Sequence, residues 1–97
     1  MNETELNYLL GKIGKRIFVQ YFHEFGNPNI SNQEVIDLLP QEYTFKSRTS
    51  RTSKSRRIFR EGLAEAALSI IANSDRVEPE AAIEARALLA QLRHRAV

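Results

Sequence analysis

The stretch ISNQEVIDLLP at residues 30–40 contains a complete signal for the start and the end of a short helix. Ser31 and Glu34 have the spacing of a capping box, in which each side chain accepts a hydrogen bond from a free backbone N–H of the first turn. The apolar residues on either side of this box have the spacing of a hydrophobic staple. Pro40 disfavours helical backbone in the residue before it, so a helix is predicted over 32–39.

A strongly basic segment follows this helix after a short polar and aromatic connection. Residues 46–60 contain seven basic side chains and no Asp or Glu, although the whole chain has 14 Lys and Arg against 12 Asp and Glu. The seven are Lys46, Arg48, Arg51, Lys54, Arg56, Arg57 and Arg60. Half of the positive charge therefore lies in less than a sixth of the chain. Such a concentration is typical of a surface that binds a polyanion.

The sequence predicts the conformation of this region only in part. From residue 58 onward, apolar side chains recur at spacings of three and four, which predicts a helix. That stripe consists of Ile58, Phe59, Leu63, Ala66, Ala67, Ile70 and Ile71. Residues 46–53 are rich in Ser and Thr, which compete for backbone hydrogen bonds, so loop and helix both stay open there. Gly62 either separates two helices or lies within one long helix.

Two further helical regions are predicted near the ends of the chain. Residues 5–25 carry apolar side chains at helical spacing, and Gly11 and Gly14 each weaken this helix by about 1 kcal/mol and allow a bend. A last helix is predicted to begin near Pro79, a residue that suits the first helical turn. Its apolar face is expected to consist of Ile83, Leu88, Leu89 and Leu92.

These elements predict an all-α fold, with residues 1–97 in a single domain. We expect a small bundle of four to five helices that includes a helix-turn-helix-like unit over about residues 31–60. The basic helix is expected to pack on the first helical region through an apolar cluster. This cluster is predicted to contain Ile58, Phe59, Leu63, Ile70, Ile71, Ile13, Ile17, Phe18 and Phe22. Tyr43 and Phe45 are expected to anchor the connection to the core.

A short capped helix, a connection and a basic helix follow one another in the order of a helix-turn-helix, whose second helix enters the major groove of DNA. We therefore expect a small regulator or accessory protein that binds duplex DNA. The expected contacts are Lys46, Arg48, Thr49, Arg51, Thr52, Lys54, Arg56 and Arg57. Backbone contacts by the cations Lys46, Arg48, Arg51, Lys54, Arg56 and Arg57 are expected to supply affinity. Base edges are expected to be read by Arg48, Thr49, Arg51 and Thr52. The connection departs from the usual tight turn, because it contains no glycine and begins with Pro40.

Several alternatives stay open at this point. The basic face could belong to a protein–protein adaptor that binds an acidic partner, to an RNA-binding protein, or to an ordinary solvated helix. Competition with DNA separates the adaptor from the DNA-binding protein, whereas salt dependence alone does not. The basic segment lacks paired exposed aromatic residues, which favours a duplex over single strands, and we expect DNA before RNA. The small size of the chain favours a homodimer, with the last helix as its expected surface.

The sequence offers little for catalysis or for metal binding. A chain without cysteine has no disulfide, thiolate metal site or cysteine nucleophile. His23 and His94 are not grouped with further ligands, so no metal site is expected. The four glycines match no phosphate-binding fingerprint, so no cofactor is expected. Glu61 and Glu65 are expected to pair with nearby arginines, and no serine has the surroundings of a nucleophile, so we do not expect an enzyme.

The location of the protein is predicted from its first residues and its hydropathy. The sequence begins MNETELNYLLGK, with acidic residues where a signal peptide carries positive charge. No apolar run approaches the roughly 20 residues that a membrane span requires. We therefore expect a cytoplasmic protein without a membrane association.

Overall fold

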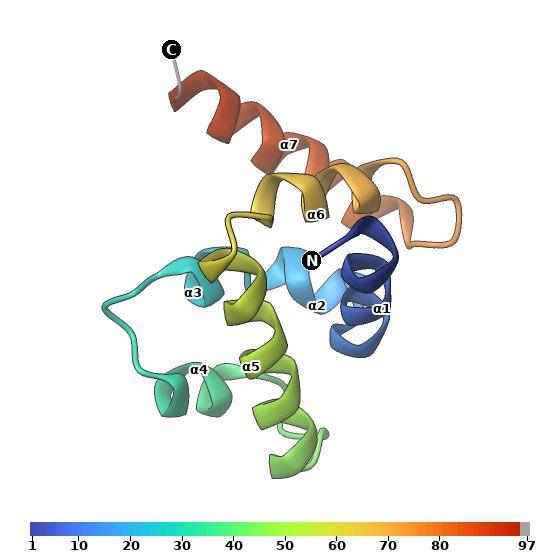
Figure 1. The fold of residues 1–97 in the computed structure, drawn as a ribbon. Coiled ribbons are helices and arrows are strands. Elements are labelled where there is room, and N and C mark those ends of the chain that lie inside the picture. Colours follow the sequence, from blue (N-terminus) through green and yellow to red (C-terminus); the bar gives the residue numbers. More distant parts are fainter. Residues whose placement is uncertain (96–97) are drawn as a thin grey trace.

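The computed structural model describes residues 1–95, and these residues form seven α-helices. The helices are α1 (Glu3–Ile13), α2 (Lys15–Gln20), α3 (Phe22–Gly26), α4 (Asn32–Leu38), α5 (Phe45–Arg60), α6 (Ala64–Ala72) and α7 (Pro79–Arg95). α6 and α7 pack together on one side, α4 lies on the opposite side, and α1 to α3 lie between them (Figure 1). α5 runs from α4 to α6 and contacts α1, α3, α4 and α6. The prediction of an all-α fold is confirmed.

The first helical region is divided into three short helices, which is why the described residues contain more than the expected four to five. α1 ends at Gly14, whose φ of 91° lies in a region that L side chains rarely adopt. The N–H of Gly14 still bonds the carbonyl of Leu10 at 2.9 Å, and α2 begins at the next residue. A second break at Tyr21 separates α2 from α3. At Gly14, where a bend was expected, the chain therefore breaks into two helices.

The capping box of α4 is present as predicted. The hydroxyl of Ser31 accepts a hydrogen bond from the N–H of Glu34 at 3.1 Å, and the Glu34 carboxylate accepts one from the N–H of Ser31 at 3.3 Å. Val35 is fully buried and Ile30 is half-buried against the core. The helix ends at Leu38, one residue earlier than predicted, with Leu39 as its C-cap.

Residues 46–53, for which the sequence allows both loop and helix, are helical throughout and belong to α5. The hydroxyl of Thr44 caps α5 by accepting a hydrogen bond from the N–H of Ser47 at 3.1 Å. At the other end, Gly62 has a φ of 72° and its N–H bonds the carbonyl of Phe59 at 3.0 Å. The N–H of Leu63 bonds the carbonyl of Ile58 at 3.0 Å, which completes a Schellman motif. Gly62 therefore separates α5 from α6.

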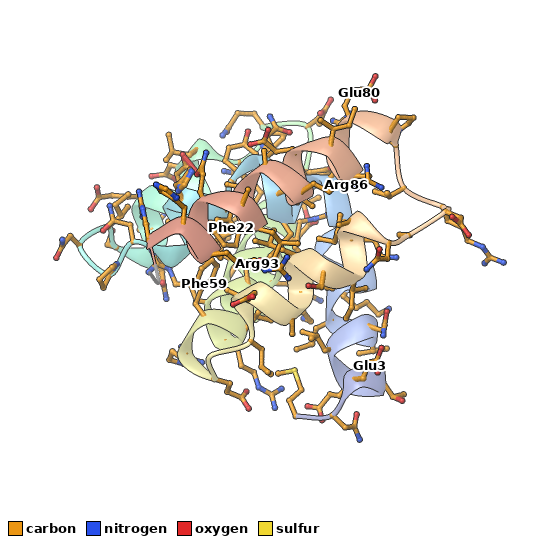
Figure 2. The ribbon with its side chains drawn as sticks, turned by 90° about the horizontal axis from the view of Figure 1, so that it is seen from above. Glu3, Phe22, Phe59, Glu80, Arg86 and Arg93 are labelled. Carbon is orange, nitrogen blue, oxygen red and sulfur yellow. The ribbon has the colours of Figure 1, made fainter. Side chains whose placement is uncertain are left out.

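The core lies where these helices meet. The ring of Phe59 lies 4.9 Å from the ring of Phe22 and 5.9 Å from the ring of Phe18, between centroids. Figure 2 shows Phe22 and Phe59 close to each other. Ile58 and Ile71 are fully buried in the same cluster. The predicted packing of α5 and α6 on the first helical region is therefore confirmed.

The buried face of α7 contains Leu88 and Leu89 as predicted, with Leu92 packed against the core, but it differs from the prediction at Ile83. Its buried residues are Ala81, Ala82, Ala85, Leu88 and Leu89. The side chain of Ile83, predicted on this face, is 62% exposed. α7 therefore approaches its neighbours through alanine, and the larger Ile83 points away.

Candidate functional site

α5 carries most of the residues that the sequence proposes for binding, and its two faces differ. One face continues the apolar stripe of Ile58 toward the start of the helix through Ser55, Thr52 and Arg48, at spacings of three and four. The opposite face carries Lys46, Thr49, Ser50, Ser53, Lys54 and Arg60. We call these six residues the outward face of α5. A helix so rich in Ser and Thr depends on its tertiary contacts, since these residues have modest intrinsic helix propensity.

Two arginines on the inward side of α5 hold the carbonyl oxygens of neighbouring segments. Arg48 donates hydrogen bonds to the carbonyls of Ile36 at 3.1 Å and of Tyr43 at 3.2 Å. Arg56 donates to the carbonyls of Asn27 at 3.2 Å and of Ile30 at 2.6 Å. These bonds attach α5 to the last turn of α4 and to the loop before it.

A third arginine, Arg51, attaches α5 to the end of α1. Its guanidinium donates to the carbonyl of Ile13, the last residue of α1, and to the Ser47 hydroxyl at 3.0 Å. It also lies 4.1 Å from the ring centroid of Tyr43. A cation is favoured at the C-terminal end of a helix, where unpaired carbonyls give a partial negative charge.

The missing side chain of Gly14 leaves space for this contact. A Cβ at Gly14 would lie 3.0 Å from a terminal guanidinium nitrogen of Arg51. Arg86 repeats the arrangement elsewhere, because it donates to the carbonyl of Ala72 at the end of α6 at 3.0 Å. A contact between an arginine of one helix and a free carbonyl at the end of another helix thus recurs in this fold.

Arg57 is bound to carboxylates instead. It lies 2.7 Å from a carboxylate oxygen of Glu61 and 2.9 Å from one of Glu5. The hydrogen bond and the charge of Glu61, followed by those of Glu5, raise the pKa of the Arg57 guanidinium above its ordinary value. The positive charge of Arg57 is therefore compensated locally, which makes it a weaker candidate for phosphate binding than the sequence suggested.

Thr52 does not fit the contact role that was expected of it. Its side chain is 1% exposed, and its hydroxyl finds no partner among the described residues. Ser55, one turn later, is likewise buried without a partner. Both lie against neighbouring helices, where short side chains let the backbones approach. A ligand on the surface cannot reach Thr52 in this fold.

The outward face of α5 forms an open surface. Thr49, Ser50, Ser53 and both lysines line a shallow hollow of about 500 Å³, in which Lys54 donates to the Ser50 hydroxyl. Phe45 lines the same hollow, and its side chain is 57% exposed. The expectation that Phe45 anchors the connection to the core is therefore wrong. Tyr43, in contrast, packs against the core as expected.

The positive charge of α5 persists although three of its arginines point inward. Arg48, Arg51 and Arg56 bind neutral carbonyl and hydroxyl groups, which do not cancel a full positive charge. Among the described basic residues of α5, Arg57 is the one that forms an ion pair. The helix therefore keeps a net positive charge, and its field can attract an anion to the outward face.

Other chemistry has little basis in the described part of the chain. Within residues 1–95 no three His, Cys, Asp or Glu side chains are grouped closely enough to hold a metal ion. No helix described there is long and apolar enough to cross a membrane. No family model, curated protein or solved structure matches this chain.

Proposed function

We propose that the protein is a small regulator or accessory protein that binds duplex DNA through the outward face of α5. The observation that carries this proposal is a helix of 16 residues that contains no acid and whose inward arginines bind carbonyls rather than carboxylates. Uncompensated cations on one helix attract a polyanion.

The residues of the outward face have distinct roles in this proposal. Lys46, Lys54 and Arg60 bind phosphates, and the short hydroxyl of Ser53 donates to the backbone or to base edges. Of the residues first expected to read bases, Thr49 is the one on this face, but its hydroxyl is buried, so it is not available to a base edge in this fold. The inward arginines contribute through their field, because their N–H groups already hold the fold together.

The structure changes the expected salt dependence of binding. Five or six phosphate contacts, as the sequence suggested, would give a slope of about −5 in log affinity against log salt. Contacts by Lys46, Lys54 and Arg60 alone give a slope of about −3. Affinity should then fall about 40-fold between 50 and 200 mM salt.

Fluorescence anisotropy with a labelled duplex of about 20 base pairs, titrated at several salt concentrations, tests this proposal. The double variant Lys46→Gln and Lys54→Gln should retain a slope of about −1 and lose only three- to fourfold over the same salt range. Lys12→Gln combined with Arg95→Gln, which removes the same two charges outside α5, is the matched control and should keep the wild-type slope. Absence of binding by the wild type at low salt contradicts the proposal.

An adaptor that binds an acidic protein is the alternative, and the exposed ring of Phe45 is the observation that favours it. Aromatic residues are enriched in protein interfaces. Excess unlabelled duplex should displace labelled DNA from the outward face but should hardly displace an acidic protein partner that also packs on Phe45.

We also propose that two copies associate through α7, which would double the DNA contacts. Ile83 is exposed on this helix, and Ala87 and Ala90 follow it at helical spacing on the solvent side. Sedimentation equilibrium should show a dimer that Ile83→Glu converts to a monomer. A wild-type protein that stays monomeric at high concentration contradicts this part of the proposal.

A further inference from the structure

A second group of cations lies away from the outward face of α5. A cavity of about 480 Å³ opens between α1, α2, α5 and the connection from α6 to α7. Four basic side chains line it, with one acid: Lys15, Arg16, Arg51, Arg76 and Glu78. We call it the α2 cavity. Its volume is within the range of cavities that bind small molecules, roughly 300–1,000 Å³.

Most of the hydrogen-bond donors in the α2 cavity are not used by the protein. The Lys15 ammonium has three N–H groups and donates to the Ser74 hydroxyl at 3.1 Å. Arg76 makes no side-chain hydrogen bond to the described residues. Arg51 is held in place by Ile13 and Tyr43, so its guanidinium is a preorganised part of the wall.

The single acid in the cavity does not balance these charges. Glu78 lies 3.5 Å from Arg16, and both side chains are 57% exposed. An exposed pair with this separation contributes at most about 1 kcal/mol and opens easily. Four cations from three separate segments of the chain therefore line one cavity with one weakly held counter-charge.

We infer that the α2 cavity binds a small phosphorylated ligand. Phosphate oxygens accept several charge-assisted hydrogen bonds at once, and arginine binds them in a bidentate manner. The apolar sides of Ile17 and Val77 and the ring of Tyr43 complete the walls and suit a ligand that carries an organic group beside its phosphates. This site is separate from the outward face of α5 and does not depend on DNA binding.

Isothermal titration of the whole protein with inorganic pyrophosphate and with ADP, at constant ionic strength, tests the inference. The wild type should show saturable binding with one site per chain. Lys15→Gln combined with Arg76→Gln should raise the Kd at least about tenfold, since each substitution removes a charge-assisted contact. Lys12→Gln combined with Arg95→Gln removes the same charge outside the cavity and should leave the Kd unchanged. Circular dichroism melts check that both double variants fold.

Three results would overturn the inference. The first is the absence of saturable binding to either probe. The second is an equal loss of binding in both double variants, which would indicate a general effect of net charge. The third is a lower affinity of the cavity variant for duplex DNA when neither small probe binds to the wild type. The cavity would then be part of a DNA-binding surface. Saturable binding that only the cavity variant loses supports the inference even if DNA binding fails.

Discussion

The substitution Arg56→Met tests whether the inward arginines hold the fold or bind a ligand. Methionine keeps an unbranched apolar side chain but removes the guanidinium that bonds the carbonyls of Asn27 and Ile30. A hydrogen bond to a charged group contributes about 1.5–3 kcal/mol when it is buried, and these two are partly buried. We expect the free energy of unfolding to fall by about 2–4 kcal/mol. For a domain of this size the Tm should fall by roughly 10–20 °C.

Urea denaturation followed by circular dichroism measures this change, with Arg60→Met as the matched control. Arg60 is exposed, so its substitution should alter the free energy of unfolding by less than about 0.5 kcal/mol. The salt slope of DNA binding should stay the same in Arg56→Met, measured where the variant is folded. A variant as stable as the control, with a slope shallower by about one, would refute the reasoning and make Arg56 a phosphate contact.

Two further predictions concern the glycine break and the buried hydroxyls. Gly14→Ala should lower the free energy of unfolding by about 1–2 kcal/mol, because φ at this position is positive and the added Cβ crowds Arg51. Gly11→Ala should raise the free energy of unfolding by up to about 1 kcal/mol, because its Cβ enters open space within α1. Urea denaturation of both variants measures the two changes. Thr52→Val should be neutral or stabilising by up to about 1 kcal/mol, because it replaces a buried, unpaired hydroxyl with a methyl group. A loss of DNA affinity in folded Thr52→Val would mean that the hydroxyl reaches the ligand after all.

Local signals in the sequence predicted the ends of helices well. Ser31 with Glu34 marks the start of α4, and Pro79 marks the start of α7. Gly62 separates α5 from α6, which is one of the two arrangements that the sequence allowed. Caps and turns depend on a few neighbouring residues, so they can be predicted from a single sequence. Whether residues 46–53 are helical could not be predicted, because contacts from α1, α3 and α4 decide it rather than the propensity of Ser and Thr.

The candidate site could be predicted as a region but not as a set of residues. Arginine is suited equally to a phosphate and to a backbone carbonyl at a helix end, and nothing local distinguishes the two for Arg48 or Arg51. One signal was available. The apolar stripe at Ile58 extends backward at helical spacing to Ser55 and Thr52, which assigns these short polar residues to the buried face. Ile83 shows the opposite case, since alanine rather than the larger residue faces the core.

The basic segment combines two requirements that usually conflict. A cation paired with a carboxylate stabilises the fold but cancels its own charge, as Arg57 does with Glu5 and Glu61. Arg48 and Arg56 stabilise the fold through neutral carbonyls and keep their full charge. Their substitution should therefore affect stability and the long-range attraction of an anion, which sets the association rate. Substitution of an outward lysine should affect the contact itself and the salt slope, with little effect on stability. Under the proposed function, the inward face of α5 would attract the ligand and the outward face would bind it.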